Sequence, residues 1–144
     1  MVDGDGEALR QRGVAIVMQS GFGVFRTGDS LKKALDKLIA LRDPLDRVTV
    51  DDDSLLWNVA LVSALELANL SEHAVVIAYS AYNRTESRGA HAREDYPKRD
   101  DENWLKHTCA WKDEEWKVTF GYRPVRLNPL SNEVQSFPLA VRTH

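Results

Sequence analysis

The sequence holds a single cysteine, Cys109, among its 144 residues. One cysteine excludes an intramolecular disulfide and any zinc or iron–sulfur site that needs several cysteines. Its apolar neighbours in an apparent strand predict a small core residue and not a reactive thiol. The histidines lie far apart without an H-x-x-H pair, and the aspartates 51–53 lack the glycine and closing glutamate of a calcium loop. We therefore expect no metal site.

The chain also lacks an excess of charge of either sign. Its 19 Lys and Arg stand against 22 Asp and Glu, for a net charge of -3. Such a balance gives no basic field for nucleic acid, so we expect no nucleic-acid partner. No apolar run reaches the roughly 18–20 residues of a membrane span, because polar residues interrupt the best candidate at 66, 69, 72 and 73. We expect no direct membrane span.

Two helices are predicted in the first 44 residues. The first runs from about Asp5 to Ser20, with a loose apolar stripe formed by Leu9, Val14, Ile16, Val17 and Met18. Residues 1–5, acidic and glycine-rich, are expected to be a linker or a remnant of cloning. The second helix begins at an N-cap, Asp29 or Ser30, and ends at Pro44. Its apolar residues recur at helical spacing: Leu31, Ala34, Leu35, Leu38 and Leu41.

Gly21–Phe25 separates these helices and contains two glycines and two phenylalanines. The phenylalanines are expected to cover the core. The glycines match only a fragment of the dinucleotide-binding pattern and follow a helix instead of a strand. We therefore predict no nucleotide site there.

A third helix is predicted from Asp53 or Ser54, either of which could cap it, to about Arg84. It contains no glycine or proline and is densely apolar, with one narrow polar ridge. This pattern predicts a helix that is buried on most of its faces.

The helical period stops after Glu86. Two alternating segments, 107–111 and 116–120, predict a hairpin with a polar turn. The tail from Tyr122 to His144 has three prolines and is expected to be extended. The predicted fold is mainly α: a three-helix bundle over 6–86, then a charged loop, β-hairpin and extended tail over 87–144. A lone hairpin is marginal in water, so we expect this last part to lie against another surface.

The charged loop offers two hypotheses about function. In the enzymatic one, His91 is a general base held by Asp95, and Arg88 and Arg93 clamp an anion. In the other, which we favour, the charges pair with each other and with the backbone to shape a docking loop. No hydroxyl nucleophile on a glycine-flanked turn and no second nearby histidine supports the enzyme. The candidate docking residues are Arg88, His91, Arg93, Asp95, Arg99, Asp100 and Trp104. As a surface pair, Arg93 and Asp95 are expected to contribute about 0–1 kcal/mol to the stability of this chain.

The segments Ser87–Pro97 and Arg99–Thr108 resemble the C-terminal region of the flavoprotein subunits of succinate dehydrogenase. The segments Gly23–Arg26, Trp57–Asn58 and Tyr122–Val125 match the same family in order, as does the ending with Pro138 and Arg142. The fumarate reductase flavoprotein shares most of these features. L-aspartate oxidase resembles the 87–97 part more loosely. The last residue departs from the family, which often ends Arg-x-Tyr where this chain ends Arg-Thr-His.

The resemblance implies a spectrin-repeat-like three-helix domain within a larger protein. In that family FAD is held by a separate domain, and the substrate-binding residues come from that domain and a capping domain. None of those motifs occurs here, so we assign no catalytic or cofactor-binding residue to this chain and expect it to be inactive alone. The implied partners are the FAD-binding and capping domains of the same subunit and an iron–sulfur subunit.

The implied parent oxidises succinate to fumarate and passes electrons through FAD and the iron–sulfur subunit to quinone. It would lie at the cytoplasmic or mitochondrial-matrix face of the inner membrane, held there through partner subunits. The alternatives are the C-terminal domain of a fumarate reductase or an L-aspartate oxidase, a stand-alone helical interaction module, or a small enzyme built around His91 and Asp95.

Overall fold

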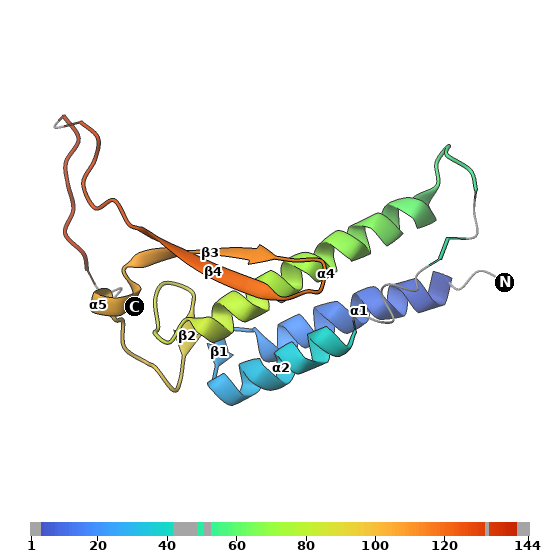
Figure 1. Cartoon of the computed structure of the whole chain (residues 1–144), viewed down its shortest axis with the longest axis horizontal. Helices are drawn as coiled ribbons and strands as arrows, with labels where there is room; N and C mark the ends of the chain where they lie inside the picture. Colours follow the sequence, from blue (N-terminus) through green and yellow to red (C-terminus); the bar gives the residue numbers. More distant parts are fainter. Residues whose placement is uncertain (1–3, 42–48, 51–52, 132, 141–144) are drawn as a thin grey trace.

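The computed structural model describes residues 4–41, 49–50, 53–131 and 133–140, with side chains from residue 12 onward. Within these residues, three main helices pack together and a two-stranded antiparallel hairpin follows them, which confirms the predicted fold class (Figure 1). The helices are α1 (Gly4–Gly21), α2 (Gly28–Ala40) and α4 (Val59–Asn83), the short α5 is Asp101–Trp104, and the hairpin strands are β3 (Lys106–Lys112) and β4 (Val118–Pro124). The predicted helix end at Pro44, residues 1–3 of the expected linker and the ending 142–144 lie outside the described residues.

Helix α2 begins with a capping box. The Oγ1 atom of Thr27 accepts a hydrogen bond from the Ser30 amide (3.1 Å), and the Ser30 hydroxyl oxygen accepts one from the Thr27 amide (3.0 Å). The prediction of Asp29 or Ser30 as N-cap was wrong, because Thr27 has the extended backbone that an N-cap needs. The predicted apolar stripe is confirmed, since the buried residues of this helix are Leu31, Ala34, Leu35 and Leu38.

Helix α1 packs closely against α2. A Cβ atom at Gly21 would lie 2.0 Å from Cβ of Ala34, so the two helices approach at a distance that only glycine allows. The predicted stripe of α1 was wrong at Ile16, which is exposed. Of the two phenylalanines expected to cover the core, Phe22 is buried, whereas Phe25 is exposed because it lies in an extended segment whose next side chain turns inward.

Helix α4 begins at Val59, several residues after the predicted start. Asn58 caps it: Oδ1 of Asn58 accepts a hydrogen bond from the Leu61 amide at 2.8 Å. The prediction that this helix is buried on most faces was wrong. Ala74, Val75, Ala78 and Ala81 form part of the core with residues of α1 and α2, and Leu67 and Ser71 are also buried. Other apolar residues of the helix, such as Leu65 and Ile77, are exposed.

By length and composition alone α4 could cross a membrane, a test that the core helix of a soluble bundle also passes. The prediction that the polar residues at 66, 69, 72 and 73 exclude a helix of this kind was wrong. Those residues are present, but they do not lower the average hydropathy of the helix below that of a membrane span.

The hairpin lies along α4, which in Figure 1 runs between it and the α1–α2 pair. Its strands pair from Lys106 opposite Pro124 to Lys112 opposite Val118. The prediction that Trp116 belongs to a strand was wrong: it lies in the turn with φ of +65°, and its side chain packs against the core. Cys109, predicted to be a core residue, is only half-buried in β3.

Candidate functional site

The charged loop folds back onto the segment that joins α1 to α2. The two-residue strands β1 (Phe25–Arg26) and β2 (Ala92–Arg93) pair in parallel, with Phe25 opposite Ala92 and Arg26 opposite Arg93. The Glu94 amide donates a hydrogen bond to the Arg26 carbonyl at 2.8 Å. Before β2 the chain reverses between Arg88 and His91 through Gly89, whose φ of +58° suits glycine. These contacts bring residues 26 and 93 together.

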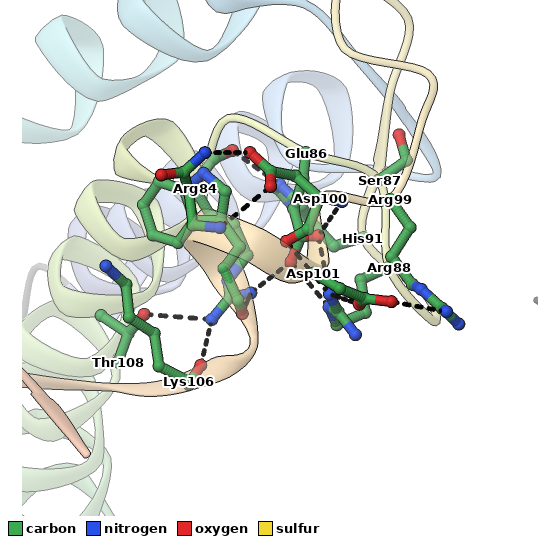
Figure 2. Close-up of polar contacts among 12 residues, drawn as sticks. Arg84, Glu86, Ser87, Arg88, His91, Arg99, Asp100, Asp101, Lys106 and Thr108 are labelled. Atoms are coloured by element: carbon green, nitrogen blue, oxygen red, sulfur yellow. Dashed lines mark hydrogen bonds and ion pairs between the residues drawn. The ribbon is translucent and has the colours of Figure 1, made fainter. Parts of the chain in front are cut away.

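Glu86 is the buried centre of the charged loop and is 0% exposed. Its carboxylate accepts hydrogen bonds from Arg88 Nε (2.7 Å) and Nη2 (3.0 Å), from the Asp100 amide (2.9 Å), and from Arg84 (Figure 2). Burial alone would raise the pKa of Glu86, but these hydrogen bonds outweigh it and lower the pKa below its usual value. In the sequence, Glu86 marks only the end of the helical period. Its alternation with Arg84 and Arg88 is the signal that could have identified it.

Arg84 joins the end of α4 to the start of the hairpin. It is the C-cap of α4, and its guanidinium donates hydrogen bonds to the carbonyls of Trp104 (3.1 Å) and Lys106 (2.8 Å). The same group lies 5.0 Å from the centre of the Trp104 ring, a cation–π contact. The indole N–H of Trp104 donates to Thr85 Oγ1 at 3.1 Å. Trp104, one of the candidate docking residues, is therefore held within the domain.

Asp101 links two arginines of the loop, Arg88 and Arg99. Arg88 Nη2 donates to Oδ1 of Asp101 at 2.6 Å, and Arg99 Nη2 donates to Oδ2 at 2.7 Å (Figure 2). Arg99 also donates to the Ala140 carbonyl at 2.6 Å, which ties the tail to the loop. Asp100, beside this pair, caps α5 with its side chain. The alternating charges of the loop therefore satisfy one another and nearby backbone groups, as the favoured hypothesis expected.

Arg93 is 3% exposed and caps the C-terminal end of α4. Its Nη1 donates to the carbonyls of Tyr82 and Arg84, both at 3.2 Å, where a cation also complements the helix dipole. Two further bonds (2.8 and 2.7 Å) join Arg93 to Asp95, which in turn accepts the Gly28 amide of α2 at 2.8 Å. The Arg93 guanidinium holds the pKa of Asp95 well below its usual range. The pair was expected to lie at the surface, which is wrong for Arg93, because this arginine is buried; the energy of the pair stays a prediction.

His91 has both ring nitrogens occupied. Its Nδ1 lies 2.9 Å from Arg26 Nη1, and its Nε2 lies 3.1 Å from the Arg84 carbonyl oxygen. Burial, followed by the nearby Arg26 and Arg93, lowers the pKa of His91. The hypothesis that Asp95 holds His91 as a general base was wrong: Asp95 bonds Arg93 and the α2 amide, and His91 bonds a different arginine and a carbonyl.

An open hollow of about 700 Å³ lies beside this network. Its lining includes Phe25, Arg88, His91, Arg99 and Leu139. Three arginines line it: Arg88 and Arg99 donate to Asp101, and Arg93 donates to Asp95. The histidine is bonded as described above. The hollow is therefore walled by paired charges, which is not the arrangement of an anion clamp.

Gly21 and Gly23 do not fit a loop that cradles phosphate groups. A Cβ atom at Gly21 would collide with Ala34, and one at Gly23 would lie 2.9 Å from the Gln19 carbonyl, so these glycines serve close packing and do not form a phosphate cradle. No cluster of three or more potential metal ligands occurs among the described residues.

Comparison with known proteins places this geometry among flavoprotein subunits. The family profile described as "Fumarate reductase flavoprotein C-term" matches residues 11–144. The chain is 48% identical over 127 residues to the succinate dehydrogenase flavoprotein subunit of Rickettsia bellii, covering 88% of this chain and 21% of that protein. It is 41% identical over 111 residues to the fumarate reductase flavoprotein subunit of Haemophilus influenzae, covering 77% and 18% respectively.

A solved structure of E. coli quinol fumarate reductase superposes with a TM-score of 0.82 at 35% identity. The match covers 89% of this chain and 22% of that one. The chain thus spans about a fifth of the length of the relatives it matches.

Proposed function

This chain belongs to the family of C-terminal domains of succinate dehydrogenase and fumarate reductase flavoproteins, and on that basis we propose that it is the C-terminal domain of a succinate dehydrogenase flavoprotein subunit. The parent subunit would oxidise succinate to fumarate with FAD held by a preceding domain. Electrons would pass to an iron–sulfur subunit and quinone at the cytoplasmic or matrix face of the inner membrane. The 48% identity to a dehydrogenase, against 41% to a fumarate reductase, favours the first activity over the second.

Within such a subunit the role of this chain would be to scaffold the flavin-containing part. The observation that carries this proposal is the fully buried Glu86, bonded to Arg84, Arg88 and the Asp100 amide. These bonds hold the end of α4, the loop and the approach to the hairpin as one unit. A loop whose charges are used in this way is suited to a fixed shape and not to proton transfer. The docking residues named above would act by fixing the surface that the loop presents.

The test uses the full flavoprotein, with this chain joined to the preceding four-fifths of the Rickettsia bellii relative. Flavin content and succinate-dependent dye reduction are measured together for Arg93→Ala, His91→Ala and a control, Glu94→Gln, whose side chain is exposed in the same loop. Loss of the loop's shape should lower flavin content and turnover in parallel for Arg93→Ala. The control should match the unmodified protein.

For His91→Ala we expect turnover per bound flavin within a few-fold of normal. Full flavin content with turnover reduced about 100-fold or more would instead identify His91 as a general acid or base and overturn the scaffold role. The 144-residue chain alone should bind no flavin, so a yellow preparation of it would also contradict the proposal.

A further inference from the structure

The turn before α4 carries a concentration of exposed apolar side chains. Leu55 is 88% exposed, Leu56 82% and Trp57 96%, and Val59 and Val62, three residues apart on the first turns of α4, are exposed as well. We call these five residues the entry face. Monomeric soluble proteins expose single apolar residues freely, but clusters of large ones mark contact surfaces.

The backbone of this turn is fixed by hydrogen bonds. The Ser54 hydroxyl accepts from the Leu56 amide (3.2 Å) and donates to the Leu56 carbonyl (2.9 Å). The buried Asn58 donates from Nδ2 to the Ser54 carbonyl at 2.9 Å and caps α4 with its Oδ1. The leucine and tryptophan side chains are thus displayed on an ordered support. Preordering of this kind lowers the entropic cost of binding.

Trp57 has a φ of +57°, which is unfavourable for an aromatic residue. Its side chain gains almost nothing from burial within this chain, because 96% of it is exposed. The strained backbone is held by the bonds on either side of it, including one from the Val59 amide to the Trp57 carbonyl at 2.9 Å. An exposed tryptophan on a strained, fixed backbone is suited to act as an anchor in an interface.

The length of the relatives, the direction of the helices and the charge of the chain indicate what covers this face. The relatives extend about four-fifths of their length beyond the matched region, which is described as C-terminal. Helices α1 and α4 begin at the same end of the bundle, so a body that precedes α1 would lie beside the entry face (Figure 1). No lysine or arginine occurs from Val48 to Asn83, and Asp53 adjoins the face, which disfavours an anionic membrane surface.

We propose that the entry face docks against the part of the flavoprotein that precedes α1, with Trp57 as its central anchor. This inference rests on the proposed function and specifies the surface by which the scaffold holds the flavin-containing part. The contact lies apart from the charged loop, at the opposite end of α4.

The test is a labelling experiment on Leu56→Cys, made together with Cys109→Ser, in the 144-residue chain and in the full flavoprotein described above. Docking should slow maleimide labelling at position 56 by about tenfold or more in the full protein, because the interface excludes solvent and reagent. The matched control is Lys33→Cys on the exposed side of α2, where labelling should change less than about twofold in either form.

Equal labelling of position 56 in both forms, in a flavoprotein that binds flavin and oxidises succinate, overturns the docking face and leaves the proposed function intact. A full protein without flavin or turnover overturns both. Slow labelling in the 144-residue chain itself, with a dimer seen by sedimentation, shows a second copy to be the occupant. If labelling of position 56 is slowed only when phosphatidylcholine vesicles are added, the occupant of the face is lipid. Either result overturns the proposal.

Discussion

Arg26 and His91 lie 65 positions apart in the chain, and the Nη1 atom of the arginine is 2.9 Å from Nδ1 of the histidine. An arginine can only donate, so Nδ1 of His91 accepts this bond and the ring proton resides on Nε2. Nε2 then donates to the carbonyl of Arg84, the C-cap of α4. The geometry thus requires a neutral imidazole, which agrees with the lowered pKa.

This relationship predicts a loss of stability in mild acid. The folded-state pKa of His91 lies below the value of about 6.5 for an unfolded chain. Below pH 6.5 the unfolded state therefore binds a proton that the folded state resists, so stability falls as the pH decreases toward 5 and is constant above about 7 with respect to this group. His91→Gln can keep both hydrogen bonds without titrating and should show a flatter dependence of Tm on pH. An NMR titration that places the pKa of His91 at or above 6.5 would contradict the assignment.

The buried carboxylate of Glu86 should be a main determinant of stability. Glu86→Gln removes the charge that Arg84 and Arg88 share, so we expect a loss of about 3–5 kcal/mol in the free energy of unfolding. Glu94→Gln, exposed in the same loop, should change it by less than about 0.5 kcal/mol. Urea unfolding of both variants decides the matter, and a loss in Glu86→Gln as small as in the control would refute the central role of Glu86.

Arg93 should stabilise the isolated chain far more than a surface ion pair would. Arg93→Ala removes the cation at the end of α4 and both bonds to Asp95, at an expected cost of about 2–3 kcal/mol. Arg123→Ala on β4, where the side chain is exposed, serves as the control. A loss below about 1 kcal/mol in thermal or urea unfolding of Arg93→Ala would restore the surface-pair interpretation.

Two glycines of α1 should respond in opposite directions to the same substitution. Gly13→Ala places a methyl group 4.0 Å from Leu41, an ordinary contact, and should stabilise the helix by about 0.5–1 kcal/mol. Gly21→Ala places its methyl group 2.0 Å from that of Ala34, so α1 and α2 must separate, at a cost of about 1–3 kcal/mol. Thermal melts of the pair test the close packing, and a stabilising Gly21→Ala would be inconsistent with it.

Substitution of the two tryptophans with positive φ, Trp57 and Trp116, should affect stability differently. Trp57→Gly relieves an unfavourable backbone and removes an exposed side chain, so the Tm of the 144-residue chain should stay the same or rise. Trp116→Gly relieves the same kind of backbone but removes a ring that packs on the core, and should lower stability by about 2 kcal/mol or more. Similar melting temperatures for the two variants would argue against the different burial of these rings.

The sequence alone determined the elements whose signals are local. The spacing of Leu31, Leu35 and Leu38 predicted α2, and alternation on both sides of a polar turn predicted the hairpin. The ordered agreement of the charged loop with a known family indicated the flavoprotein C-terminal domain, because such irregular segments match only where ancestry is shared. The exact starts of α2 and α4 were not predicted. Thr27 and Asn58 are the N-caps, although neighbouring residues have side chains that could cap equally well, and the choice between them depends on backbone geometry that residue type does not determine.

Only the tertiary structure decided which charges meet. His91 and Asp95 are close in sequence, yet His91 bonds Arg26 and Asp95 bonds Arg93, because the pairing of β1 with β2 brings distant residues together. Burial could not be predicted from the sequence either. Glu86 is fully buried within the loop, whereas the leucines and the tryptophan before α4 face solvent. The apolar pattern of a sequence indicates which side chains would be stabilised by burial. Whether another part of the protein covers such a side chain is determined only by how the whole chain packs.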